Sequence, residues 1–199
     1  MSICMFATCL VNGQQPASSS PSAKADDMPC GMIYGKDHFL SVCAPAGWVL
    51  DNDNPEMAKN GVFATFYRTE FTFREAMAQH TIMYVNVVLK GKGEQSASEM
   101  MRSDAARTKQ ESPNLVIEQA KPILVPTDKN TPAIQVPVQR FLNDYHGAYE
   151  AVAYVENDKT IAMIVISSVS NDLLNRDYAD FVRLVQSYRF IGSNVTIQH

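Results

Sequence analysis

The sequence predicts an α+β protein in which an antiparallel β-sheet is flanked by helices. Short apolar segments separated by Asn-Asp and Gly-rich turns occupy most of the chain, which is typical of antiparallel strands joined by hairpins. Two longer segments carry helix signals, one in the middle of the chain and one near its C-terminus. Helices that flank a run of hairpins, rather than alternating with single strands, favour a layered α+β arrangement.

The N-terminal segment has the composition of an export signal. Residues 1–23 contain no Asp, Glu, Lys or Arg, and Ile3–Val11 is a short apolar run. This run is too short to span a bilayer and matches the apolar core of a secretory signal, although no basic residue precedes it. We therefore expect a signal segment over residues 1–13. A lipid anchor through Cys9 and a plain N-terminal strand or tail are the alternatives.

The rest of the chain is expected to contain a single domain. Residues 14–26 are small, polar and rich in Pro and Ser, which predicts a disordered tether. Residues 27–192 then form one α+β domain, and residues 193–199 a C-terminal tail.

The overall composition excludes some classes of protein. With 46% hydrophobic residues, 19% charged residues and a net charge of −4, the chain is ordinary for a globular domain. It has no basic block, so it lacks the electrostatic footprint of a nucleic-acid binder. No segment after the N-terminal run is long and apolar enough to be transmembrane.

Two cysteines, Cys30 and Cys43, stand on either side of a turn-like Gly-Lys-Asp-His run. If the flanking segments pair as an antiparallel hairpin with Lys36 and Asp37 at its tip, Cys30 faces Cys43. Directly opposed residues have Cβ atoms about 4.5–5.5 Å apart, which is near the separation that a disulfide needs. The spacing therefore predicts a disulfide, and with it an oxidising location, periplasmic or secreted.

The next segments predict a turn, a short helix and two strands. Asp51-Asn52-Asp53-Asn54 favours an Asx-rich turn that caps a helix over Pro55–Lys59; a calcium loop is the alternative, but the glycine and final glutamate of such a loop are not matched. Val62–Tyr67 is a short strand candidate. Ile82–Leu89 is a longer one, and because both its faces are apolar we expect it inside the sheet.

Ser96-Ala97-Ser98-Glu99 is a capping box, in which the serine hydroxyl and the glutamate each satisfy a backbone N–H at a helix start. The residues expected on the buried face of this helix recur at helical spacing: Ala97, Met101, Ala105 and Thr108. Asp104 is expected on the exposed face. Ser112-Pro113 ends the helix, because a residue before proline is pushed out of the α region.

The second half predicts a meander of antiparallel strands. Ala133–Leu142 alternates apolar and polar residues, and Pro137, which cannot donate to a ladder, predicts either an edge strand or a bulge. Asn-Asp pairs turn the chain into Tyr145–Glu156 and then into Thr160–Val169. The last of these segments is apolar on both faces and is expected at the centre of the sheet.

A helix is predicted over Asn171–Ser187, followed by a short closing strand. Its apolar residues form one buried stripe at helical spacing: Leu174, Tyr178, Phe181, Val185 and Tyr188.

Two segments resemble a known family. Phe39–Trp48 is similar to the strand followed by Pro-x-Gly-Trp that opens the PsbP/Mog1-like fold, and the C-terminal helix running into Ser187-Tyr188-Arg189-Phe190 is similar to how those chains end. The resemblance covers roughly residues 27–192 and is closest to exported bacterial members. It implies an antiparallel sheet in an α/β/α sandwich and a role in binding a protein partner or assisting assembly. Fold alone does not transfer function.

Candidates for chemistry are few. No Gly-x-Ser-x-Gly elbow, Walker loop or dinucleotide glycine pattern occurs, and the histidines at 38, 80, 146 and 199 belong to no recognisable catalytic pattern. A cysteine nucleophile would need a free thiol, whereas Cys30 and Cys43 are expected to be bonded. We expect no catalytic residue, no cofactor and no metal. Trp48 is expected to plug the core, with a ligand contact as the alternative.

Tyr67, Phe71 and Phe73 form the candidate partner surface. They fall at a strand end and in a segment, Thr69–Gln79, that is expected to be a loop. Large apolar side chains without a core partner in such a loop would form a lid or a contact patch. Ordinary packing of these rings is the alternative.

Two classes of function stay open. The first is a non-catalytic exported module that binds a protein partner or assists assembly, with no nucleic acid involved. The second is a small-molecule binder or hydrolase with its site between the sheet and the 69–79 loop. A deep pocket with converging polar groups would favour the second class, and a flat apolar patch rimmed by charge the first.

Overall fold

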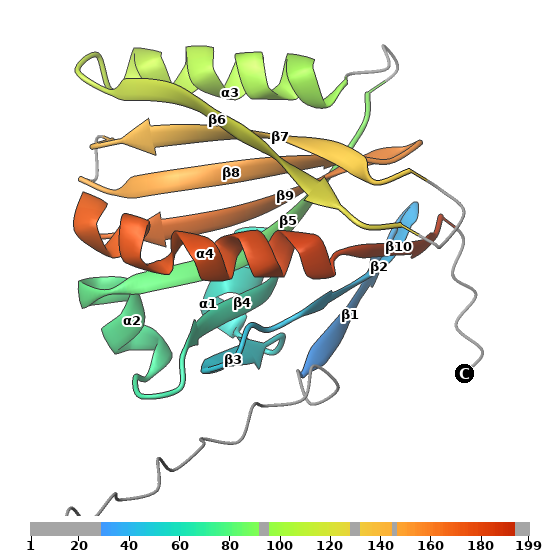
Figure 1. Cartoon of the computed structure of the whole chain (residues 1–199), viewed down its shortest axis with the longest axis horizontal. Coiled ribbons are helices and arrows are strands. Elements are labelled where there is room, and N and C mark those ends of the chain that lie inside the picture. The colour runs from blue at the N-terminus through green and yellow to red at the C-terminus, as the bar shows by residue number, and fades with distance from the viewer. Residues whose placement is uncertain (1–28, 92–95, 128–131, 145–146, 194–199) are drawn as a thin grey trace, which may run out of the picture.

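Ten strands and four helices make up the part of the chain that the computed structural model describes, residues 29–91, 96–127, 132–144 and 147–193 (Figure 1). The expected signal segment, tether and C-terminal tail lie almost wholly outside these residues. The α+β class is confirmed, since the strand pairings are antiparallel. The strands form two sheets rather than the single one expected: a seven-stranded sheet in the order β3-β4-β5-β9-β8-β7-β6 and a three-stranded sheet in the order β1-β2-β10.

The strands are β1 (Cys30–Gly35), β2 (His38–Cys43), β3 (Trp48–Asp51), β4 (Val62–Arg68), β5 (Thr81–Leu89), β6 (Val116–Val125), β7 (Ile134–Leu142), β8 (Tyr149–Glu156), β9 (Thr160–Ser168) and β10 (Arg189–Gly192). The helices are α1 (Pro55–Ala58), α2 (Phe73–Gln79), α3 (Ala97–Glu111) and α4 (Asn171–Ser187). None of the helices in the described residues is long and apolar enough to cross a membrane.

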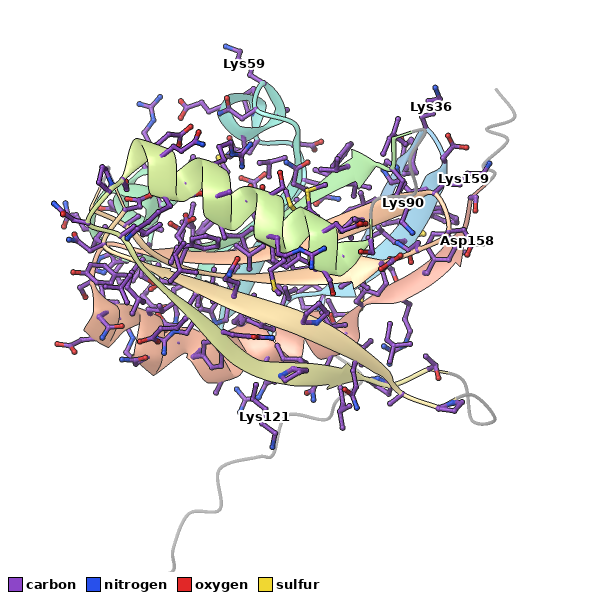
Figure 2. The ribbon with its side chains drawn as sticks, turned by 90° about the horizontal axis from the view of Figure 1, so that it is seen from above. Lys36, Lys59, Lys90, Lys121, Asp158 and Lys159 are labelled. Atoms are coloured by element: carbon purple, nitrogen blue, oxygen red, sulfur yellow. A yellow bond between two sulfur atoms is a disulfide. The ribbon has the colours of Figure 1, made fainter. Side chains whose placement is uncertain are left out.

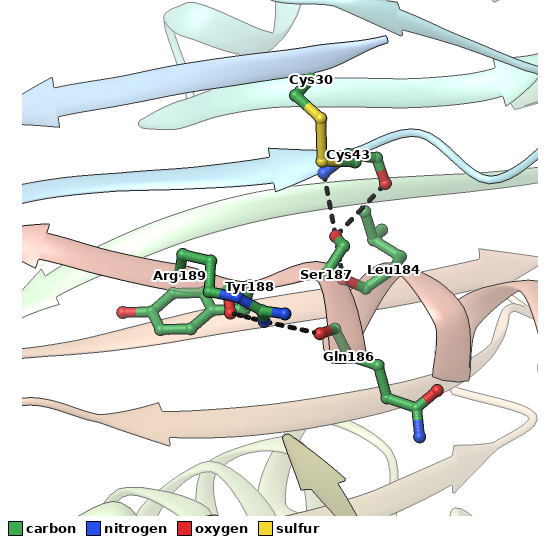
Figure 3. Close-up of a disulfide and its surroundings, with 7 residues drawn as sticks. All are labelled: Cys30, Cys43, Leu184, Gln186, Ser187, Tyr188 and Arg189. Carbon is green, nitrogen blue, oxygen red and sulfur yellow. Dashed lines mark hydrogen bonds between the residues drawn. A yellow bond between two sulfur atoms is a disulfide. The ribbon is translucent and has the colours of Figure 1, made fainter. Parts of the chain in front are cut away.

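The β1–β2 hairpin has the register expected from the cysteine spacing. Cys30 lies opposite Cys43, and the two are joined by a disulfide (Figure 3). Asp37, in the two-residue loop, has a φ of 62°, a left-handed conformation that Asp tolerates in tight turns. Ser187, at the end of α4, accepts a hydrogen bond from the Cys43 N–H at 2.9 Å and donates to the Leu184 carbonyl at 2.6 Å. These bonds tie the hairpin to the last turn of α4.

The central part of the large sheet confirms two expectations. β9 is the middle strand of the seven, and β5 lies beside it in the interior. On one face of β5, Met83 and Val85 are fully buried in the main core, while Ile82, Tyr84 and Asn86 alternate onto the other face. This alternation is why the two faces of the sheet have separate surroundings.

β6 was not expected from the sequence, because its apolar residues do not alternate cleanly. It forms the edge of the large sheet, so β7 is an interior strand and the edge-strand alternative for Pro137 is wrong. The bulge alternative is correct: the β6–β7 register shifts between Ala120 and Ile123, opposite Pro137. The irregularity falls where proline has no N–H to give to the ladder.

Part of the expected loop at 69–79 is helical, which corrects that expectation. α2 begins with a capping box, in which the Thr72 hydroxyl accepts from the Glu75 N–H at 3.4 Å and a Glu75 carboxylate oxygen accepts from the Thr72 N–H at 2.9 Å. The Thr-Phe-Arg-Glu sequence carries this signal. The capping box expected for α3 is confirmed, and α4 has its expected bounds.

Helices cover both faces of the large sheet. α4 and the three-stranded sheet cover one face and enclose the main core. On the other face, α3 packs over β7, β8 and β9, while α1 and α2 pack over β4 and β5. Figure 2 shows α3 and α4 on opposite sides of the sheet. The face that bears α3 therefore carries two separate helical layers.

Candidate functional site

A pocket of about 770 Å³ lies on this face, between the α1–α2 pair and the β7–β8 turn. Its floor is formed by side chains from three neighbouring strands. Ile82 of β5 lies opposite Ser167 of β9, and Ser167 lies opposite Glu150 of β8, so the three form one row across the sheet. Tyr84, two residues along β5, extends the floor toward the α3 layer.

Ser167 explains why the floor is hollow. The preceding residues of β9 on this face, Ile161 and Val165, are buried in the cluster under α3. At the next position on the same face the strand has only a serine, which leaves room above the sheet. The space is therefore set by one small side chain that follows apolar residues on the same face of β9.

Two short helices form one wall. The Asn54 side chain accepts from the N–H groups of Glu56 and Met57, which starts α1 and places Met57 against the sheet. At the end of α2, the His80 N–H donates to the Ala76 carbonyl at 2.9 Å, and the His80 carbonyl accepts from the Val169 N–H at 3.2 Å. The second bond joins the end of α2 to the end of β9.

The candidate partner surface lies behind this wall. Tyr67, Phe71 and Phe73 are half-buried and pack around Ala76 and Ile82. The Tyr67 and Phe73 rings meet edge to face at 6.0 Å, and Phe71 stacks on the His80 ring at 3.8 Å. The three rings therefore have packing partners that support α2, and their binding of a protein partner stays a prediction.

Met77 is the large apolar side chain of α2 that reaches the surface. It is 54% exposed and lines the pocket. Val169, which is 42% exposed, lines the same pocket. The rim therefore offers apolar surface that a ligand could remove from water.

Two carboxylates, those of Asp144 and Glu150, line the pocket, and the described lining residues include no Lys or Arg. Asp144 is held by its own turn, since its Oδ1 accepts from the Ala148 N–H at 2.7 Å. Burial raises the pKa of Tyr84 far above its usual value, and the charges of Glu150 and Asp144 raise it further. The Tyr84 hydroxyl therefore remains a hydrogen-bond donor at any physiological pH.

The pocket combines histidine, serine and carboxylate, but not in the geometry of a nucleophilic site. Within the described residues, no hydrogen bond joins the His80 ring to Ser167, Ser168 or Glu150. The Ser168 hydroxyl instead lies 2.9 Å from the Thr81 hydroxyl. An activated serine needs a base within hydrogen-bond reach, and the His80 ring is stacked on Phe71.

A second polar cluster lies inside the molecule, on the α4 side. The Arg68 guanidinium contacts Asp177 at 2.6 Å and Asp180 at 3.0 Å. Trp48 is 2% exposed, as expected for a core plug, and its Nε1 donates to Asp180 at 3.1 Å. Burial raises the pKa of Asp177, but hydrogen bonds from Arg176, Arg68 and Thr81 outweigh it and hold the pKa below its usual value.

This cluster was missed from the sequence, although a signal was present. Asp177 and Asp180 fall at helical spacing within the buried stripe of α4, three residues from Leu174 and one from Phe181. Charged residues at core positions are almost never left unpaired, so the pattern called for a cationic partner. Because their carboxylates are engaged by arginines, the cluster holds β4 to α4 and offers no site to a ligand.

Asp104 was expected on the exposed face of α3, and that expectation is wrong. It faces the sheet, where the Tyr154 hydroxyl donates to it at 3.1 Å. Burial raises the pKa of Asp104 above its usual value, against the hydrogen bond from Tyr154 and the charge of Arg107. Met100, three residues after Ala97, is also buried on this face of α3.

No group of three His, Cys, Asp or Glu in the described residues is placed to hold a metal ion. The acidic turn at 51–54 is an Asx-rich helix cap, as predicted. Asp51 accepts from the Asp53 N–H and from the Asn54 side chain, both at 3.2 Å. Its oxygens therefore serve the turn.

Comparison with protein-family models and with curated proteins finds no match. The solved structures that are similar to this chain include the following two. One is the solution structure of cyanobacterial PsbP (CyanoP) from Synechocystis sp. PCC 6803, with a TM-score of 0.48 and 12% identity over 89% of this chain and 100% of that chain. The other is the Saccharomyces cerevisiae Ran-binding protein Mog1p, with a TM-score of 0.45 and 10% identity over 81% of this chain and 95% of that chain.

Both neighbours have the PsbP/Mog1-like fold, whose opening segment Phe39–Trp48 resembles. At these identities and TM-scores the likeness concerns the arrangement of strands and helices alone. The role of neither neighbour is carried over to this chain.

Proposed function

We propose that this protein is a non-catalytic binding module whose binding site is the pocket between the α1–α2 pair and the β7–β8 turn. The observation that carries the proposal is the pocket itself. Its volume of about 770 Å³ lies within the range of natural ligand sites, about 300–1,000 Å³. It also joins apolar walls to polar groups from several elements, which is the usual composition of such sites.

Methionine methyl NMR tests this proposal directly. Met57 and Met77 line the pocket, so their methyl signals should shift when a ligand enters. The probes are phenyl compounds of different charge, benzyl alcohol, benzylamine and benzoate. Saturable shifts at both methyls with at least one probe are expected, while Met32, on the distant three-stranded sheet, should not respond.

A blocking variant provides the control. Ser167→Leu should fill the hollow floor and abolish the shifts, since the added side chain enters open space rather than a packed core. The matched variant Ser103→Leu, on the exposed face of α3, should bind normally. Binding that survives Ser167→Leu, or no response to any probe, would refute the pocket as the site.

A second candidate, docking of a protein partner, is favoured by a different surface. Four large apolar side chains are exposed on the outer strands of the three-stranded sheet: Met32 at 62%, Tyr34 at 57%, Ile191 at 51% and Phe190 at 38%. Met32 and Tyr34 share one face of β1, whereas Phe190 lies in the row of Leu40 and Ile33 on the other face. Neighbouring exposed apolar residues such as Met32 and Tyr34 mark interaction sites more often than scattered ones do. We propose this sheet, ahead of Tyr67, Phe71 and Phe73, as the surface that a protein partner would cover.

Capture from an envelope extract tests the second candidate. Met32→Ser with Tyr34→Ser should lose a partner that the wild type retains. Leu124→Ser, which removes an equally exposed apolar side chain at 54% on β6, should retain it. Equal capture by both variants would remove this candidate and leave the pocket proposal intact.

We further propose that the protein acts in an exported, oxidising compartment. The Cys30–Cys43 disulfide supports this, because disulfides persist mainly in secreted and periplasmic proteins. Cell fractionation should place the protein outside the cytoplasm, with the disulfide formed. Recovery in the cytoplasm with free thiols would overturn the proposal.

A further inference from the structure

We infer that a second cleft, between the bulged part of β6 and α4, binds an organic anion, a carboxylate carried on an apolar body. This cleft has a volume of about 440 Å³. It lies on the face of the large sheet that bears α4, opposite the pocket beside α1 and α2. The inference is therefore independent of binding in that pocket.

The cleft lies where β6 is bulged. The β6–β7 register shifts between Ala120 and Ile123, so Lys121 and Pro122 together lie opposite Pro137. A bulge re-aims the side chains of the strand that carries it, and here both bulge residues line the cleft. At the far end of the cleft, Gln186 Nε2 of α4 donates to the Leu124 carbonyl at 3.5 Å, which ties the helix to the strand.

The charged side chains that line the cleft are both basic. Lys121 comes from the bulge and Arg140 from β7, and the lining residues include no Asp or Glu. Lys121 is exposed, and its ammonium has no carboxylate partner within the described part of the chain. Two cations without a carboxylate in the same wall would attract an anion.

The Arg140 guanidinium is held in place without being neutralised. Its Nη2 donates to Asn175 Oδ1 at 2.8 Å and to Asn171 Oδ1 at 3.3 Å, and these amides carry no charge. Glu118, a half-exposed carboxylate outside the lining, lies 3.8 Å from Nη1, and such exposed ion pairs are weak. Arg140 Nε is buried without an acceptor among the described residues. A ligand carboxylate could therefore displace Glu118, because the planar guanidinium suits carboxylates.

An aromatic ring and apolar side chains complete the walls. The centre of the Tyr178 ring lies 5.8 Å from the Arg140 guanidinium carbon. Burial raises the pKa of Tyr178 and the charge of Arg140 lowers it, so the field of the arginine reaches this hydroxyl, which stays protonated at neutral pH and can donate to an anion. Leu124, which is exposed, and Val182 line the same cleft. An apolar ligand body would cover them, which is favourable by the hydrophobic effect.

The test compares three probes of nearly equal size that differ in charge at pH 7: phenylpropionate is negative, phenylpropanol is neutral and phenylpropylamine is positive. Titrations are followed by NMR at the methyl groups of Leu124 and Val182, with Val116, at the other end of β6, as the reference that should not respond. Phenylpropionate should bind about tenfold more tightly than phenylpropanol, with phenylpropylamine weakest. Added salt should weaken phenylpropionate binding and leave phenylpropanol unchanged, since salt screens charge.

Charge-changing variants then locate the effect. Lys121→Gln should reduce the preference for phenylpropionate by about threefold or more, and Arg140→Gln should reduce it further. Lys59→Gln removes the same charge from the end of α1, where the side chain projects away from the molecule (Figure 2), and should keep the preference. Glu118→Gln removes the competing carboxylate and should strengthen phenylpropionate binding. If Arg140→Gln fails to fold, the exposed positions Lys121 and Glu118 still decide.

Equal affinity for phenylpropionate and phenylpropanol at the Leu124 and Val182 methyls, or no response there to any probe, would overturn the inference. An equal loss of preference in Lys59→Gln and Lys121→Gln would also overturn it, because net charge alone would then account for the effect. Neither result bears on the pocket beside α1 and α2, whose binding is read at Met57 and Met77.

Discussion

The two faces of the seven-stranded sheet are covered in different ways. On one face, the 17-residue helix α4 and the three-stranded sheet enclose one continuous core, in which Leu174, Phe181 and Val185 are fully buried. On the other face, α3 and the α1–α2 pair bury two separate clusters, and the pocket lies between the α1–α2 pair and the β7–β8 turn. The pocket thus arises where that pair and that turn stand apart above the sheet, with Ser167 in the floor between them.

The carboxylates on the two faces of the sheet have different surroundings. Asp177 and Asp180 lie against Arg68 inside the α4 side, so their charges are compensated within the protein. Asp144 and Glu150 line an open pocket whose described walls carry no Lys or Arg. The carboxylates of Asp177 and Asp180 therefore hold α4 to β4, whereas those of Asp144 and Glu150 lie in the wall of a pocket.

The largest expected effect is the loss of a core ring on the continuous face. Phe181→Ala should lower the free energy of unfolding by about 3–5 kcal/mol, because a fully buried ring leaves both a transfer loss and a cavity. Urea denaturation measures it. Leu124→Ala, at an exposed position of β6, should change stability by less than about 0.5 kcal/mol. A comparable small loss for Phe181→Ala would mean that this core is not continuous.

The disulfide joins the two strands of the β1–β2 hairpin in the small sheet. Replacing Cys30 and Cys43 together with Ser should cost about 3 kcal/mol in the chain-entropy model and leave the fold unchanged. Thermal melts under non-reducing conditions measure the loss, and mass spectrometry of the wild type should find the two cysteines linked. Two free thiols in exported protein would contradict both the bond and the location inferred from it.

Truncating side chains on the face of the sheet that bears the pocket should lower stability by less than truncating Phe181. Phe71→Ala with Phe73→Ala should cost about 1–3 kcal/mol, a typical range for side chains that are only partly buried. The loss arises because both rings support α2. A thermal melt that shows no loss would restore the hypothesis that these residues form a free contact surface, and a loss as large as that of Phe181→Ala would remove the contrast between the faces.

The smallest effect at neutral pH is expected for Asp104, and its pH dependence should oppose that of Asp177. The folded pKa of Asp177 is lowered, so its contribution is present above the unfolded value of about 3.9 and is lost as pH falls through the folded pKa. The folded pKa of Asp104 is raised, so its charged form costs stability at neutral pH, and that cost disappears as pH falls through the folded pKa.

Stability profiles of two variants separate these contributions. Asp177→Asn should destabilise at pH 7 and flatten the loss of stability in acid. Asp104→Asn should change stability at pH 7 by less than about 1 kcal/mol, since its Arg107 partner is largely exposed. Parallel profiles for the two variants would show that the two carboxylates have equivalent surroundings, against the structure.

Local chemistry in the sequence determined many of the elements. The two-residue turn and the cysteine spacing specify the β1–β2 register, because the side-chain period of a strand is two. A capping box specifies the start of α3, and the helical spacing of apolar residues specifies α4. The same reasoning applied to Thr72 and Glu75 would have found α2, so this omission was avoidable.

Only the tertiary structure decided how these elements combine. The sequence pattern does not show that the strands divide into two sheets, that Arg68 reaches Asp177 from β4, or that Ser167 lies between Ile82 and Glu150. Each of these depends on pairing between segments far apart in the chain, and such pairings are chosen by the packing of whole faces rather than by local preference. The pocket is made of such pairings, which is why its location could be guessed near the 69–79 segment but its lining and charge could not.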